Sequence, residues 1–114
     1  MKLMTKAIET ALAKPGLTGQ NAQVPICKFF NPTGAATWLI FARETDEPDV
    51  LWGLADLGMQ CIEYGTISLS ELQAFRGRFG LGIERDLHFQ PKRHANGELW
   101  KLADYLKLDT LVGI

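Results

Sequence analysis

Apolar residues recur at helical spacing at the start of the chain. Residues 2–14 place five apolar side chains on one stripe of a helix, and Pro15 followed by Gly16 stops the pattern. The sequence therefore predicts an amphipathic helix over this range. Its apolar stripe consists of Leu3, Ala7, Ile8, Ala11 and Leu12.

Four apolar segments after this helix have the length and composition of β-strands. Residues 24–30 (VPICKFF) predict a strand that Pro25 limits to a sheet edge or to a strand start, because proline donates no ladder hydrogen bond. Residues 36–43, 50–56 and 59–65 predict three more strands, the first of them almost entirely apolar. The links between them are too short for crossover helices, so we expect an antiparallel meander.

A specific helix start follows the fourth strand. Ser68 and Glu71 have the S-x-x-E spacing of a capping box, in which each side chain bonds the backbone N–H of the other residue. We expect this helix to end at Gly77, with Arg76 beside the negative end of the helix dipole.

The last third of the chain predicts one more strand and one more helix. Residues 83–89 (IERDLHF) alternate, with Glu84, Asp86 and His88 on the polar face. The other face would consist of Ile83, Arg85, Leu87 and Phe89. A final helix is expected to begin near Asn96, with an inner stripe of Leu99, Leu102, Ala103 and Leu106.

These elements add up to a single α+β domain over residues 1–114. We expect an antiparallel sheet of four to five strands, with the N-terminal, middle and C-terminal helices packed on one face. The chain has 114 residues and 46% hydrophobic residues, which is enough to bury a core without a metal or disulfide. Cys27 and Cys61 both have apolar neighbours, so we interpret them as two buried thiols.

Composition also limits the setting and the partners. The formal net charge is −1, so the molecule as a whole does not attract nucleic acid. The N-terminal residues are polar at every turn, unlike a signal peptide, and no apolar run approaches the roughly 18 residues of a membrane span. We therefore expect a cytoplasmic protein with no membrane partner, and no cofactor motif is present.

Glu84, Asp86 and His88 are the candidates for catalysis. On one strand face they could bind a metal or perform acid–base chemistry. A half-buried strand must show polar residues on its other face in any case, so we favour a solvated face with ion pairing. His94 lies six residues after His88, which is weak metal-ligand spacing.

Charge is segregated along the chain, which indicates either two solvated blocks that partly neutralise each other in the fold or two binding surfaces. Residues 44–75 contain no lysine or arginine, and four of their acids fall in the loop ETDEPD. Such a loop suits a basic partner surface. Its candidate partner-binding residues are Glu44, Asp46, Glu47 and Asp49.

The following segment is basic and suggests a direct nucleic-acid contact instead. Phe75 and Phe79 interleave with arginines, as in single-strand binders, although their spacing of four also suits a helix core. The candidate nucleic-acid-binding residues are Arg76, Arg78, Arg85, Lys92 and Arg93.

Four stretches of the chain resemble the bacterial domain of unknown function 2958 family. They are KFFNPTGAATW, WGLADLG, EYGTISLSEL and RGRFGLGIERDLHFQP, and the resemblance covers about residues 2–91. Gly82 stands where the family pattern has proline, and His88 stands where it has an aromatic residue. Residues 92–114 lie outside these motifs and are read as a C-terminal helical extension.

The resemblance implies a setting, because members of this family are typical of mobile genetic elements. It attaches no catalytic activity to the pattern. We therefore expect a non-enzymatic interaction protein that binds and inhibits or modulates a basic nucleic-acid-handling protein, for instance a CRISPR or other host-defence complex. The alternatives are a nucleic-acid-binding accessory protein that uses the basic 76–93 segment, and a small metal-dependent or acid–base enzyme.

Overall fold

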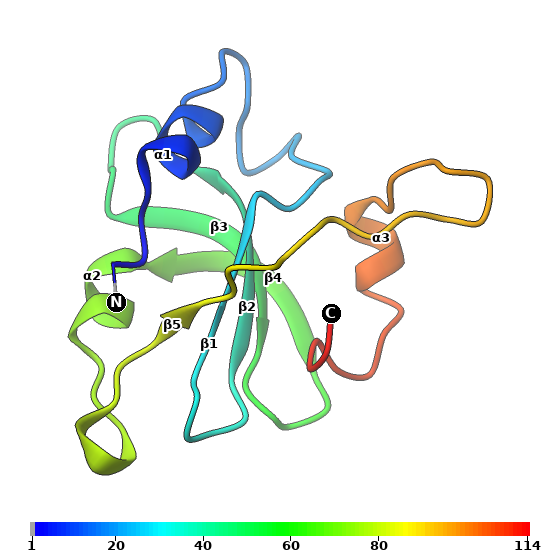
Figure 1. Ribbon diagram of the computed structural model, residues 1–114. Helices are drawn as coiled ribbons and strands as arrows, with labels where there is room; N and C mark the ends of the chain where they lie inside the picture. The colour runs from blue at the N-terminus through cyan, green and yellow to red at the C-terminus, as the bar shows by residue number, and fades with distance from the viewer. Residues whose placement is uncertain (1) are drawn as a thin grey trace.

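The computed structural model describes residues 2–114 and shows one antiparallel sheet with three short α-helices (Figure 1). The strand order is β4-β3-β2-β1-β5, so the first four strands form the expected meander and the α+β class is confirmed. The strands are β1 (Cys27–Phe30), β2 (Thr37–Arg43), β3 (Val50–Asp56), β4 (Ile62–Ser68) and β5 (Glu84–Arg85). The helices are α1 (Lys6–Leu12), α2 (Leu69–Ala74), α3 (Leu102–Tyr105) and the 3₁₀ turn η1 (Arg78–Gly80).

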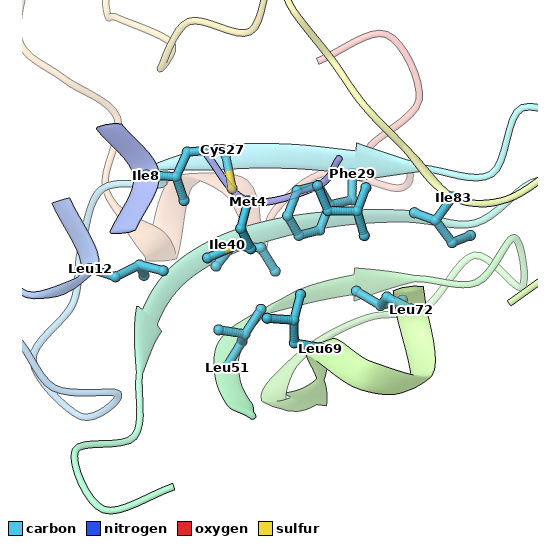
Figure 2. Packing of buried hydrophobic residues seen from close by; sticks show 11 residues of the cluster. Met4, Ile8, Leu12, Cys27, Phe29, Ile40, Leu51, Leu69, Leu72 and Ile83 are labelled. Atoms are coloured by element: carbon cyan, nitrogen blue, oxygen red, sulfur yellow. The ribbon is translucent and has the colours of Figure 1, made fainter. Parts of the chain in front are cut away.

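Both faces of the sheet are buried. On one face, α1 and α2 pack against the strands in the cluster of Figure 2, which includes Ile40. On the other face, Leu39 and Phe41 pack against Tyr105 of α3 and Leu111 of the C-terminal segment. The expectation that all helices cover one face is therefore wrong for α3. A strand as continuously apolar as β2 has to be covered on both sides.

The predicted strands of the meander form, with two changes at their boundaries. β1 begins after Pro25 and lies between β2 and β5, so this proline marks a strand start and not a sheet edge. β4 begins three residues later than predicted. Gly58 and Gln60 have positive φ angles of 87° and 59° and form the turn that precedes it.

The predicted strand 83–89 is wrong beyond Arg85. The Asp86 carboxylate accepts a hydrogen bond from the backbone N–H of His88 at 2.9 Å, which closes a turn and ends β5. Leu87, expected in the core, is 64% exposed. A local side-chain-to-backbone bond has overridden the alternating pattern.

The last helix also begins later than predicted. Asn96 and Gly97 form the tip of a hairpin in which the N–H of His94 donates to the carbonyl of Glu98 at 2.8 Å. α3 begins at Leu102, and its inward residue is Tyr105, whereas Ala103 and Leu106 of the predicted stripe are exposed.

α2 starts at the predicted Ser68 cap, where the structure shows one of the two expected capping-box bonds, and the helix start has an additional partner. Ser68 Oγ accepts the backbone N–H of Glu71 at 3.2 Å, and Asp49 accepts that of Ser70 at 2.7 Å. Because α2 ends at Ala74, it is shorter than the expected helix to Gly77. None of the helices in residues 2–114 is long and apolar enough to cross a membrane.

We expect Ser68→Ala to lower the free energy of unfolding by about 1 kcal/mol, because the N–H of Glu71 loses its cap. Urea denaturation followed by circular dichroism measures the change. Thr10→Ala, an exposed hydroxyl within α1, is the control and should leave stability within about 0.5 kcal/mol of wild type. Equal stability of Ser68→Ala and wild type would contradict the capping role.

Candidate functional site

The acidic loop, residues 44–49, is a tight connection between β2 and β3. The backbone N–H of Glu44 donates to the carbonyl of Val50 at 2.8 Å, and the N–H of Val50 donates to that of Glu47 at 2.9 Å. The Glu44 carboxylate accepts the indole N–H of Trp52 at 2.7 Å. Asp46 and Glu47 are exposed to solvent. The loop is thus held at its start while these two carboxylates face outward.

Asp49 holds the other end of the loop against α2. Its carboxylate accepts hydrogen bonds from the Ser68 hydroxyl at 2.9 Å and from both the backbone N–H and the hydroxyl of Ser70. The Ser68 hydroxyl, followed by the two Ser70 donors, lowers the pKa of this carboxyl below its ordinary value. Of the four predicted partner-binding residues, Glu44 and Asp49 therefore brace the loop, whereas Asp46 and Glu47 are displayed.

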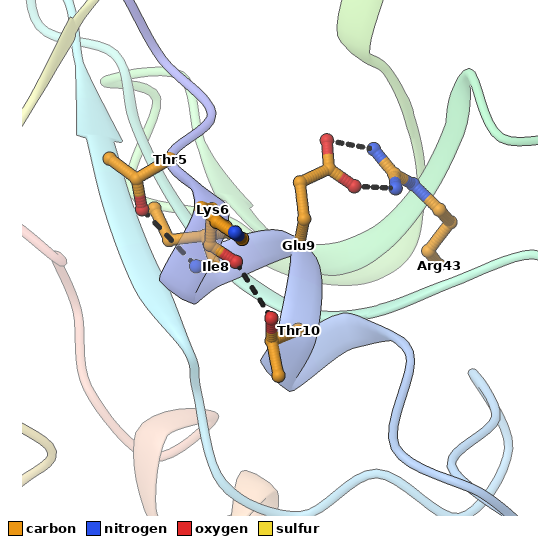
Figure 3. A network of polar contacts seen from close by, with 6 residues as sticks. All are labelled: Thr5, Lys6, Ile8, Glu9, Thr10 and Arg43. Carbon is orange, nitrogen blue, oxygen red and sulfur yellow. Dashed lines mark hydrogen bonds and ion pairs between the residues drawn. The ribbon is translucent and has the colours of Figure 1, made fainter.

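Ion pairing within the chain does not neutralise the loop. Arg43, at its base, directs its guanidinium to Glu9 of α1, as Figure 3 shows. The hydrogen bond from Arg43 is the main cause of the lowered pKa of Glu9. The other ion pairs among residues 2–114 are Lys28–Asp86 and His94–Asp104. None of these pairs involves a carboxylate of the acidic loop.

The predicted basic residues do not gather into one patch. Arg76 donates to the carbonyls of Gln73 and Phe75, at the end of α2. Arg85 donates to the backbone carbonyls of residues 2 and 3. In Figure 1, residues 76–78 lie at the lower left of the molecule, whereas residues 92 and 93 lie at the base of the orange hairpin on the right.

The remaining cations of this set have local contacts or are exposed. Arg93 donates to the carbonyl of Gly97 at 2.7 Å, and the Lys92 ammonium lies 5.1 Å from the centre of the Trp100 ring. Arg78 is exposed on η1. Most of these side chains therefore stabilise the fold, which leaves little of the continuous positive groove that a nucleic-acid strand would require.

The spacing of Phe75 and Phe79 suggested that they are core residues, and this is wrong. They are 41% and 90% exposed, respectively. The helical spacing does not apply to them because α2 ends at Ala74 and Phe75 already has an extended backbone.

Glu84, Asp86 and His88 do not share a strand face, because β5 ends before Asp86. The Asp86 carboxylate lies 3.5 Å from the ammonium of Lys28, a buried residue of β1, which also donates to the carbonyl of Ile114 at 2.9 Å. The three predicted residues border a hollow of about 370 Å³ together with Lys28. Within the described part of the chain, no group of three or more His, Cys, Asp or Glu is placed to hold a metal ion.

The two cysteines differ from the expectation of two buried thiols. Cys27 is buried, and burial raises the pKa of its thiol to about 12. Cys61 is exposed in the turn before β4, and its thiol donates to the Glu63 carboxylate at 3.4 Å, which is the main cause of its raised pKa.

Asp56 is a structural carboxylate that the sequence analysis missed. It is 1% exposed at the end of β3 and accepts the backbone N–H groups of Gly58 and Leu111 and the hydroxyl of Thr110, all within 2.9 Å. Burial raises the pKa of this carboxyl, but the three hydrogen bonds outweigh burial and hold it below its ordinary value. The only sequence signal was an acid two residues before a glycine at a strand end.

These observations define a small α+β protein that displays a braced acidic hairpin loop. The chain belongs to the family described as protein of unknown function (DUF2958), whose model matches residues 3–107. The match extends beyond residue 91, where the recognised motifs ended, and takes in α3. No curated protein and no solved structure matches the chain.

We expect Asp56→Asn to lower the free energy of unfolding by about 2 kcal/mol at neutral pH, because the buried donors lose a charged acceptor. A lowered carboxyl pKa contributes stability that is complete above the unfolded value, about 3.9, and is lost as pH falls through the folded value. The stability difference between wild type and Asp56→Asn should therefore shrink in acid. Urea titrations from about pH 6 to about pH 2.5 measure it, and a difference independent of pH would contradict this role.

The different accessibility of the two cysteine thiols provides a test of the fold. Native protein should react with one equivalent of a disulfide reagent, at Cys61, and with a second equivalent only in denaturant, because the Cys27 thiol is buried and protonated. Absorbance of the released thiolate measures both steps, and Cys61→Ser is the control that should abolish the first. Two rapid equivalents in the native state would show that Cys27 is accessible.

Proposed function

We propose that this protein is a non-enzymatic interaction protein that binds a basic, nucleic-acid-handling protein through its acidic loop. The partner is of the kind found in host-defence complexes such as CRISPR effectors, and binding would inhibit or modulate it by covering its nucleic-acid site. The setting of a mobile genetic element, suggested by the sequence motifs, is part of this proposal.

The observation that carries the proposal is the display of Asp46 and Glu47. Their loop is braced by Glu44 on Trp52 and by Asp49 on α2, so the two carboxylates sit on an ordered scaffold. An ordered loop loses little conformational entropy when it binds. The arginine at its base is paired with Glu9, so the loop keeps its negative charge for a partner.

The chemistry of such a loop suits a protein surface built to hold phosphates. Clustered lysines and arginines on a nucleic-acid channel attract exposed carboxylates, and complementary charge raises the rate of association and selects the partner. Exposed charges are screened over roughly 8–10 Å at physiological salt, so binding should weaken as salt rises.

The test is an affinity capture from bacterial lysate, with and without nuclease. We expect wild type to capture a protein that survives nuclease, and we expect the double variant Asp46→Lys, Glu47→Lys to lose it. Glu98→Lys with Asp109→Lys is the matched control: it makes the same charge change at exposed acids outside the acidic loop, and it should capture normally.

Equal capture by both double variants would contradict the assignment of the acidic loop. A captured species that disappears with nuclease would contradict direct binding to a protein. Thermal denaturation of both variants checks that the fold is intact, because reversing exposed charges should shift stability only slightly.

A further inference from the structure

The loop that follows α2, residues 75–82, carries a group of exposed apolar side chains, and we call it the η1 tip. Phe75, Phe79 and Leu81 are 41%, 90% and 42% exposed, respectively. In Figure 1 the tip is the yellow-green loop at the lower left, and it projects away from the sheet. Exposed apolar side chains that gather in one place mark interaction sites more often than single ones do.

Phe79 carries a backbone cost in addition to its exposure. Its φ of 59° and ψ of 20° lie in the left-handed region, which disfavours residues with a side chain. The ring is almost fully exposed, so the chain gains almost no burial in return. Backbone strain that no burial within the fold offsets is typical of functional sites, so it indicates that Phe79 contacts a binding partner.

The η1 tip is ordered by its own hydrogen bonds. The N–H of Gly77 donates to the carbonyl of Leu81 at 2.7 Å, and the N–H of Gly80 donates back to the carbonyl of Gly77 at 3.1 Å. Arg76 holds the end of α2 through two backbone carbonyls. The Phe79 ring is therefore presented on a closed loop, which reduces the entropy lost on binding.

The charges of the tip favour a protein pocket over a nucleic-acid strand. Residues 75–82 contain no acid, and their two cations are Arg76, which is engaged with backbone, and Arg78, which is exposed. Nucleic-acid affinity grows with the number of phosphates neutralised, and one available guanidinium contributes little. Aromatic residues, phenylalanine among them, and arginine are both enriched in the cores of protein interfaces.

The tip and the acidic loop lie at the two ends of one short helix. Asp49 binds the first turn of α2, and the tip begins where α2 ends. The six residues of α2 span about 9 Å, but the two loops extend beyond its ends to the upper left and the lower left of Figure 1, so one partner reaches both by covering this whole side of the molecule. The exposed residues of α2 between them are Ser70, Glu71, Gln73 and Ala74.

From these observations we infer that Phe79 is an aromatic anchor. It inserts into an apolar pocket of the same partner protein whose basic surface contacts the acidic loop, and Arg78 meets carbonyl or carboxylate oxygens at the pocket rim. This inference rests on the proposed function, since it assigns a second contact to the same complex.

The test uses two changes at one position. Phe79→Ala and Phe79→Gly should each weaken binding of the captured, purified partner by about tenfold or more, since an anchor ring dominates its interface. Phe79→Gly should also raise the Tm, because glycine adopts positive φ without strain. A variant that is more stable but binds less cannot owe its defect to unfolding.

Gln60→Gly is the matched control, because Gln60 is the other described non-glycine residue with positive φ, also 59°. It lies in the exposed turn before β4, so it should raise the Tm and leave binding unchanged. Binding is measured by titration and Tm by calorimetry, with all variants in the full-length chain.

The outcomes separate this inference from the proposed function. If both Phe79 variants bind normally while the double variant Asp46→Lys, Glu47→Lys loses binding, the anchor role of Phe79 is contradicted and the binding role of the acidic loop is supported. A lower Tm for Phe79→Gly overturns it as well, since the ring would then support the fold. A gel shift of single-stranded DNA that Phe79→Ala abolishes would assign the tip to nucleic acid instead. A wild type that captures nothing contradicts both proposals.

Discussion

Burial of β2 on both faces is the constraint on which the rest of the structure depends. Leu39 and Ile40 point to opposite sides of the sheet, and both are fully buried. A central strand of this kind requires two layers of cover, although residues 2–114 contain only three short α-helices to provide them. α1 and α2 cover one side, and the C-terminal segment with Tyr105 and Leu111 covers the other. With both sheet faces covered, the exposed surface consists of loops, strand edges and the outer faces of the helices.

Charged side chains complete this arrangement by binding backbone. Asp49 accepts the N–H of Ser70 at the start of α2, Asp56 ties the C-terminal segment to β3, and Arg85 holds the N-terminal segment by donating to its carbonyls. Hydrogen bonds that involve a charged group stabilise a fold more than neutral ones do. A short helix or an irregular segment has few hydrogen bonds of its own, so such anchors hold it in place.

The charged side chains fall into two kinds: those that are hydrogen-bonded within the fold and those that are exposed to solvent. The acidic stretch of residues 44–75 looks uniform in sequence, yet Glu44, Asp49 and Asp56 are engaged while Asp46 and Glu47 are exposed. The basic stretch divides in the same way. The displayed groups sit at the acidic loop and the η1 tip, which extend from opposite ends of α2, and the two proposals made for this protein assign both loops to one partner.

The described residues with positive φ also divide into those that only form turns and one, Phe79, that displays a large apolar side chain. Four of the five described glycines with positive φ, such as Gly97, have open space around them, and Gly58 has Ala35 as its single neighbour. Phe79 adopts the same region with a large side chain that the fold leaves in solvent. Unlike a glycine in an ordinary turn, Phe79 is strained by this conformation, and its exposed side chain adds almost no burial to offset the strain.

Local chemistry in the sequence by itself determined β2, β3, the part of the predicted helix 2–14 that forms α1 at Lys6–Leu12, the Ser68 cap and the acidic loop, because each depends on residues a few positions apart. The tertiary structure alone decided which face of the sheet α3 covers, that Cys61 is exposed, and which carboxylates remain displayed. The hydrogen bond from the Leu111 N–H to Asp56 joins residues 55 positions apart, and the pair of Lys28 with Asp86 joins β1 to the residue after β5, which meet only when the sheet forms. Local periodicity carries no information about such contacts, since their free energy appears only when distant segments are brought together.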